Sequence, residues 1–80
     1  MKYVEKLKKA FNKTLNIPIS NINDDLEYGA EGWDSIAHMA LIASIEEVLD
    51  IMIETDDVID MSSFAKAKDI VKKYGIDLDA

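Results

Sequence analysis

The stretch Trp33–Leu49, WDSIAHMALIASIEEVL, decides the fold of this 80-residue chain. An acidic loop with two glycines ends at Trp33, and a long segment without proline or glycine follows Asp34. Because Asp is a preferred N-cap residue, this junction predicts a helix from about Ser35 to Leu49. Ser35 would then lie in the first turn, where the backbone amides and the helix dipole favour a bound anion such as a phosphate.

The helix predicted after Asp34 has apolar residues on two opposite faces. At about 100° of rotation per residue, the residues expected in the core share one face: Leu41, Ile42, Ile45, Val48 and Leu49. The other face carries small or flexible apolar residues that give way to carboxylates: Ile36, Met39, Ala40, Ala43, Glu46, Glu47 and Asp50. Such a face is typical of a docking surface for partner proteins, and the alternative is that a loop or another helix covers it.

Helical patterns also flank this segment. A first amphipathic helix is predicted over residues 2–15, from the spacing of Val4, Leu7, Phe11 and Leu15. Residues 16–34 then form a long loop. A short helix over residues 55–61, capped by Thr55, precedes a last helix capped by Ser62 or Ser63 and ended by Gly75. We therefore predict one all-α domain over residues 1–80, a four-helix bundle of three main helices and a short third helix.

The charges are segregated along the chain. The net charge is −7, and all nine lysines lie before Thr14 or after Ala65 in a chain without arginine. All acidic residues lie between those two positions except Glu5, Asp69, Asp77 and Asp79. Such a field repels nucleic acid and anionic lipid and attracts basic protein surfaces to the middle of the chain. The alternative is a solvated surface that keeps a small protein in solution.

Several classes of protein are disfavoured by composition. Lysines and Glu5 interrupt the first apolar positions, so no signal peptide is recognisable, and no apolar run approaches the roughly 20 residues of a membrane span. We therefore expect a cytoplasmic monomer. The chain has no cysteine and hence no thiol of its own. The acidic segment 24–29 lacks the spacing of a calcium loop, so no metal site is predicted.

His38 follows Ser35 by three residues, which invites comparison with a serine hydrolase. The chain lacks the G-x-S-x-G motif and any second histidine. A small helical bundle also rarely provides an oxyanion site. We therefore expect His38 to lie among core residues, hydrogen-bonded to nearby backbone, and the protein not to be an enzyme.

Taken together, these features resemble the acyl carrier protein family over nearly the whole chain. They are an amphipathic first helix, a long loop with Asp24-Asp25-Leu26, Asp34-Ser35-Ile36 at the start of the second helix, Glu46-Glu47 near its end, an acidic short third helix and a short last helix. An Asp-Ser-Ile tripeptide alone is common by chance. Its place near the middle of an acidic, cysteine-free helical chain makes the resemblance specific.

The resemblance implies a carrier with a covalent cofactor. A phosphopantetheinyl transferase would move 4′-phosphopantetheine from coenzyme A to the hydroxyl of Ser35, with Asp34 assisting, and acyl groups would be held as thioesters on this arm. In this family the acyl chain also enters between the helices, which here would involve Leu41, Ile45 and Ile59. Enzymes that load, modify or transfer the acyl group would place basic patches on Ile36, Met39, Ala40, Ala43, Glu46, Glu47, Asp50, Asp56 and Asp57.

The chain departs from the family pattern beside the serine. Ala37 and Ala40 stand where carriers of fatty-acid biosynthesis usually have acidic residues, and Ile36 stands in place of Leu. The segment Trp33–His38 is more similar to stand-alone carriers of polyketide, peptide or glycan-modifying pathways. The pathway, and the choice between fatty acyl, aminoacyl and hydroxyacyl cargo, therefore stay open. An alternative of another class is an unmodified helical interaction module in which Ser35 is an ordinary first-turn residue.

Overall fold

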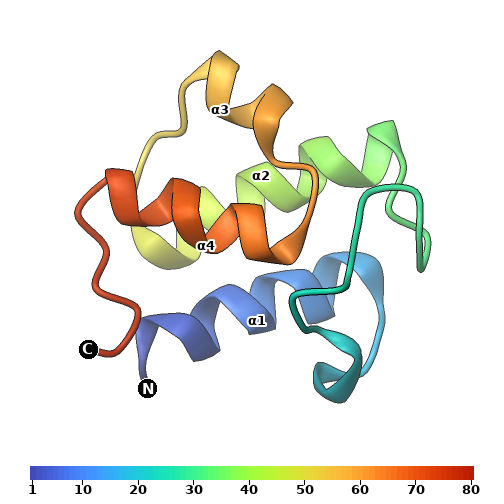
Figure 1. Ribbon diagram of the computed structural model, residues 1–80, viewed down its shortest axis with the longest axis horizontal. Coiled ribbons are helices and arrows are strands. Elements are labelled where there is room, and N and C mark those ends of the chain that lie inside the picture. Colours follow the sequence, from blue (N-terminus) through green and yellow to red (C-terminus); the bar gives the residue numbers. More distant parts are fainter.

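Four α-helices make up the regular structure of the protein in the computed structural model, which describes residues 1–80 (Figure 1). The loop between the first two helices contains a single 3₁₀ turn, η1 (Ile19–Asn21). The predicted all-α bundle, with a short third helix and one long loop, is confirmed. The helices are α1 (Tyr3–Leu15), α2 (Ser35–Leu49), α3 (Thr55–Asp60) and α4 (Phe64–Lys73).

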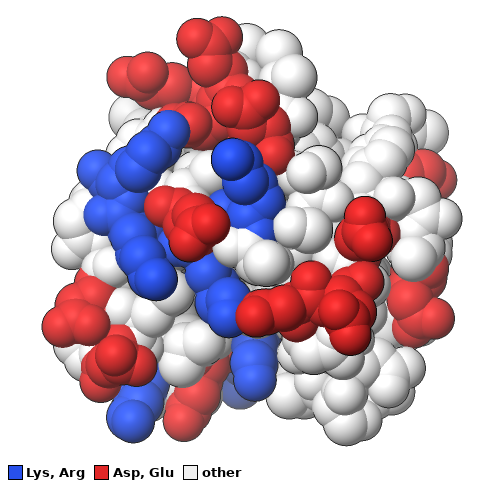
Figure 2. All heavy atoms as spheres, viewed as in Figure 1, with Lys and Arg blue, Asp and Glu red and all other residues white.

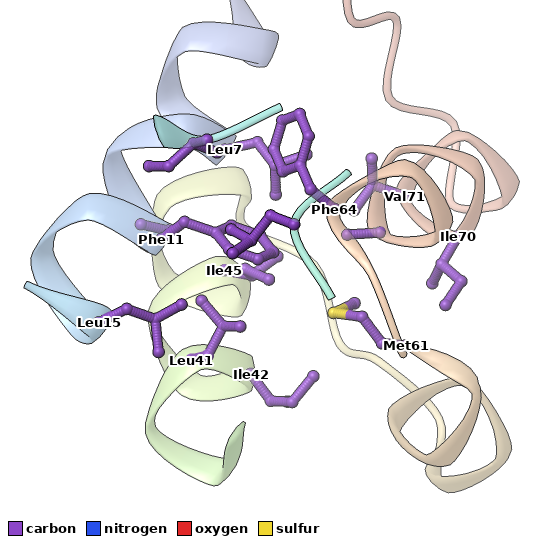
Figure 3. Packing of buried hydrophobic residues seen from close by; sticks show 14 of the residues in the cluster. Leu7, Phe11, Leu15, Leu41, Ile42, Ile45, Met61, Phe64, Ile70 and Val71 are labelled. Carbon is purple, nitrogen blue, oxygen red and sulfur yellow. The ribbon is translucent and has the colours of Figure 1, made fainter. Parts of the chain in front are cut away.

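The core lies between α1, α2 and α4. Figure 3 shows the apolar face of α1 turned toward side chains of α2 and α4. An aromatic cluster fills its centre, where the ring of Phe11 packs edge-on against Trp33 and Phe64. The centroid of the Phe11 ring lies 5.3 Å from that of Trp33 and 5.1 Å from that of Phe64. Of the predicted core face of α2, all but Val48 are buried, and Val48 is half-buried. Burial of this face fixes the rotation of α2 about its axis.

The long loop between α1 and α2 packs down on the bundle. Ile17, Ile22 and Leu26 are buried. The loop is also tied to the start of α4, because the Tyr28 amide donates to the Ser62 carbonyl at 2.9 Å and the Phe64 amide to the Leu26 carbonyl at 3.0 Å. These bonds hold the end of the loop at one place beside α2.

The N-caps of α3 and α4 differ in how well they match the sequence predictions. Thr55 does not cap α3: Glu54 takes the N-cap position, and no side chain bonds to the first turn from there. Ser63 rather than Ser62 caps α4, and its hydroxyl accepts from the Lys66 amide at 2.9 Å. Gly75 ends α4 as predicted, with a φ of +87° that glycine adopts without strain.

Charge is segregated in space as well as in sequence. On the face shown in Figure 2, lysines form a band over α4 and α1, while acidic residues gather over α3, along the right side and at the lower left, with one group inside the band. Two ion pairs are present, Lys68 with Asp24 at 2.7 Å and Lys73 with Asp57 at 2.5 Å. Most charged groups therefore lie without a partner of opposite sign. None of the helices has the length and hydropathy to cross a lipid bilayer.

Candidate functional site

Ser35 is exposed at the first position of α2. The preceding Asp34 is in an extended conformation, and its Oδ1 accepts a hydrogen bond from the Ala37 amide at 2.8 Å. This is the N-cap that the sequence predicted. Because the first amides of a helix have no acceptor within the helix, the hydroxyl of Ser35 stands beside unpaired N–H groups at the positive end of the helix dipole.

A compact turn leads into Ser35. Gly29 and Gly32 have φ angles of +97° and +78°, and Glu31 between them has a φ of +54°. The amide of Gly29 donates to the carbonyl of Trp33 at 2.8 Å, and the Trp33 side chain is 1% exposed. The buried indole of Trp33 therefore anchors this loop turn. The fixed turn then sets the direction in which α2 begins.

A groove of about 450 Å³ begins at Ser35 and runs between α2 and α3. Most of its lining is apolar, and it comes from α2, from α3 and from the loops before α2 and after α3. The lining residues are Tyr28, Ser35, His38, Met39, Val58, Ile59, Met61 and Ser62. No sequence pattern indicated that Tyr28, Val58 or Met61 would line a groove with Ser35, because Val58 and Met61 belong to a distant segment and Tyr28 belongs to an irregular loop.

His38 joins the walls of this groove. Its Nδ1 accepts from the Nε1–H of Trp33 at 2.9 Å, and its Nε2 lies 2.7 Å from the carbonyl oxygen of Val58 in α3. The expected hydrogen bond from His38 to backbone is thus confirmed. The expected place among core residues is wrong, because His38 is half-buried in the wall of the groove. Since both ring nitrogens are engaged, neither is available to take a proton from Ser35, and these two residues do not form a nucleophile–base pair.

Most of the predicted docking residues of α2, its C-cap and α3 are exposed. Ile36 and Met39 are 82% and 60% exposed. Glu46 is half-buried, and its Oε2 accepts from the Ile53 amide at 2.8 Å. The remaining residues of the prediction, apart from Asp57, are exposed: Ala40, Ala43, Glu47, Asp50 and Asp56.

Asp57 differs from its neighbours, because it is 7% exposed and faces α4. Its Oδ1 accepts from Nζ of Lys73 and its Oδ2 from the hydroxyl of Tyr74, each at 2.5 Å. The hydrogen bonds from Lys73 and then Tyr74 lower the pKa of the Asp57 carboxyl, and bonding to Asp57 raises the pKa of both partners. The predicted docking role of Asp57 is therefore corrected to a contact within the fold.

The three residues expected around an acyl chain differ in burial. Leu41 and Ile45 are fully buried in the core, whereas Ile59 is 74% exposed at the rim of the groove. Ile59 thus shares the exposed apolar lining of the groove with Met39. Its position among the acidic residues of α3 was the signal that could have indicated exposure.

Comparison with known proteins places the chain in a family. A family model described as the phosphopantetheine attachment site matches residues 5–71 and so spans α1 to α4. No curated protein and no solved structure matches the chain. Because the matching model covers most of the chain, the protein belongs to the phosphopantetheine attachment site family, whose members are carriers with covalently attached 4′-phosphopantetheine.

Proposed function

We propose that Ser35 is the residue that carries the 4′-phosphopantetheine and that the protein holds acyl intermediates as thioesters on this arm. The observation that carries the proposal is the exposed Ser35 hydroxyl at the start of α2. The matched residues contain four other serines. Of these, Ser63 caps α4 and Ser44 is half-buried within α2, whereas Ser20 and Ser62 are exposed outside the four helices.

The surroundings of Ser35 fit a phosphate-linked arm. The first turn of α2 offers amide N–H groups and the positive end of a 15-residue helix to a phosphate on the hydroxyl. The apolar groove that starts at the same residue gives the next atoms of the arm a surface to lie on. When attached, the arm supplies the thiol that a chain without cysteine lacks.

Asp34 assists the transfer of the arm in this proposal. Its Oδ1 holds the Ala37 amide, so the first turn of α2 and the hydroxyl of Ser35 keep one orientation. A transferase therefore meets a serine that is already in position, which lowers the ordering cost of the reaction. The chain itself contributes position and an anion site, and the chemistry belongs to the transferase and to the acyl-handling enzymes.

Partner enzymes would dock on a surface that we call the docking face. An apolar centre lets a partner exclude water, and the carboxylate rim attracts basic patches and raises the association rate at low ionic strength. We propose enzymes that load, modify or transfer acyl groups in a fatty-acid, polyketide or other specialised biosynthetic pathway. The docking face comprises Ile36, Met39, Ala40, Ala43 and Ile59, with Glu46, Glu47, Asp50 and Asp56 at its rim.

The test is the intact mass of the protein after incubation with coenzyme A and a broad-specificity phosphopantetheinyl transferase. We expect wild type and the control Ser20→Ala each to gain one phosphopantetheine, and Ser35→Ala to gain none. If Ser35→Ala still gained the phosphopantetheine and Ser62→Ala did not, the attachment residue would be Ser62 and not Ser35. No gain by wild type with several transferases would favour an unmodified interaction module.

A further inference from the structure

The shortest helix, α3, forms one wall of the groove, yet few of its own side chains are buried. Ile59 is 74% exposed, Val58 is only half-buried, and the one residue of the helix that counts as buried is Asp57. A six-residue helix is not stable by itself. Its apolar anchors are Val58, which packs against the core, and the buried Ile53 and Met61 just outside its two ends. Polar contacts add to these in fixing where α3 lies.

Those polar contacts reach α3 from two sides. On one side, Tyr74 accepts from the Glu54 amide at 2.9 Å and donates to Asp57, so α4 holds the first turn of α3. On the other side, the imidazole of His38 bonds to the carbonyl of Val58 at 2.7 Å. His38 is the one side chain of α2 that hydrogen-bonds to α3, and it lines the groove together with Ser35.

The partners of His38 allow one protonation state of the imidazole. An indole N–H only donates, so Nδ1 must be unprotonated to accept from Trp33. A carbonyl oxygen only accepts, so Nε2 must carry the proton that it shares with Val58. A charged imidazole would point an N–H of its own at the indole N–H across 2.9 Å. The geometry therefore requires the neutral imidazole protonated on Nε2.

The two hydrogen bonds of His38 connect Trp33, just before the start of α2, with Val58 in α3 across the groove. Trp33 is 1% exposed, and its indole lies nearly parallel to the His38 ring, with the ring centroids 5.9 Å apart and an angle of 23° between the planes. The same tryptophan precedes Asp34, which orders the turn containing Ser35. His38 thus links α3 to Trp33, which ends the turn that leads into Ser35.

We propose that His38 is a positioning residue of the carrier site, which as a neutral Nε2-protonated imidazole holds α3 as the second wall of the groove at Ser35. The inference rests on the proposed attachment of the arm to Ser35. His38 touches neither the arm nor the serine hydroxyl in this role. It acts through Val58 and therefore sets the surface that a transferase or partner enzyme meets beside the serine.

The tautomer is tested by ¹⁵N–¹H correlation spectra of the single imidazole at neutral pH. We expect Nε2 protonated, Nδ1 unprotonated, and slow exchange of the single indole N–H of Trp33. His38→Phe keeps a ring at this position and removes both bonds, so we expect the α3 amides to exchange about tenfold faster or more. His38→Gln, whose amide N–H reaches toward Val58, should restore much of the lost protection.

Asn12→Leu is the matched control. The Asn12 amide also donates to a backbone carbonyl, that of Ile17, in a half-buried setting away from α3. We expect it to leave exchange of the α3 amides at the wild-type rate. The opposite tautomer, an unchanged exchange rate in His38→Phe, or equal acceleration in Asn12→Leu would each overturn the proposal.

The functional readout is the transferase reaction with coenzyme A. Because Ser35 is untouched, His38→Phe should raise KM for the carrier severalfold and leave kcat near the wild-type value. An unchanged KM in a variant whose α3 opens faster would overturn the positioning role. If wild type is not modified at all, the attachment proposal fails instead, and the spectra still decide the tautomer and the bond to α3.

Discussion

Ser35 differs from the other serines of the chain in its place rather than in its chemistry. It is exposed, it opens α2, and the residue before it orders the first turn through the bond from the Ala37 amide to Asp34. Asp57 shows the converse, since its carboxylate has the same chemistry as that of its exposed neighbour Asp56 but faces α4. Successive residues of a helix point in directions about 100° apart. This rotation is why Asp56 is exposed to solvent while Asp57 bonds to the end of α4.

The cap of α2 predicts a loss of stability in Asp34→Ala. The variant leaves the Ala37 amide without its side-chain acceptor, so we expect the free energy of unfolding to fall by about 1 kcal/mol. Urea unfolding followed by circular dichroism measures this change. Asp34→Asn retains a side-chain oxygen at the cap and serves as the control. Equal losses in both variants would show that charge, and not the capping bond, supplies the stability.

At the scale of elements, α3 is the part of the bundle that packing secures least. Most of its side chains are exposed, and its place depends on His38 from α2 and on Lys73 and Tyr74 from the end of α4. A helix held in this way opens at lower cost than one held by a core.

Acid should weaken the contact between α3 and α4. The ion pair and the phenol lower the pKa of Asp57 from its ordinary value of 3.8. The stability that it contributes is therefore complete above that value and is lost as the pH falls through the lowered one. In Asp57→Asn we expect the unfolding free energy to decline less steeply between about pH 5 and pH 2.

The measurement is a series of urea unfolding curves over this pH range. Asp56→Asn is the matched control, because the exposed side chain one residue earlier makes no ion pair. We expect it to keep the wild-type steepness. If Asp57→Asn kept the wild-type steepness as well, the pair with Lys73 would contribute nothing to the folded state.

At the scale of the whole molecule, the separation of charge has consequences for stability as well as for docking. The middle of the chain is acidic throughout, and two of its carboxylates, Asp24 and Asp57, form ion pairs with lysines of α4. Folding brings the other carboxylates closer together than they are in the unfolded chain. Their mutual repulsion opposes the compact state and is reduced by salt.

We therefore expect the melting temperature to rise with ionic strength. A series in sodium chloride from low to moderate concentration, followed by circular dichroism, measures the effect, and a divalent cation at equal ionic strength should raise the temperature further by closer association with the carboxylates. A melting temperature that stays flat or falls over this range would contradict the role given to self-repulsion.

Much of the fold was predictable from local patterns. The apolar spacing of α1 and α2, the cap at Asp34 and the glycine at the end of α4 each act within a few residues, so the sequence by itself determined the helices, their order and the place of Ser35. The cap of α3 was the exception. The amide of Glu54, the N-cap residue of α3, donates to the hydroxyl of Tyr74, which lies 20 residues further along the chain.

Only the tertiary structure decided the groove and the inner face of α3. The groove unites Tyr28, His38 and Val58 from three segments. His38 bonds to Val58, 20 residues away, and Asp57 bonds to Lys73, 16 residues away. Helical periodicity tells which residues share a face, but the orientation of a short polar helix depends on long-range bonds that no local pattern encodes. For this reason the sequence placed Ser35 at the start of α2, and the packing of α2 against α3 shaped the surface beside it.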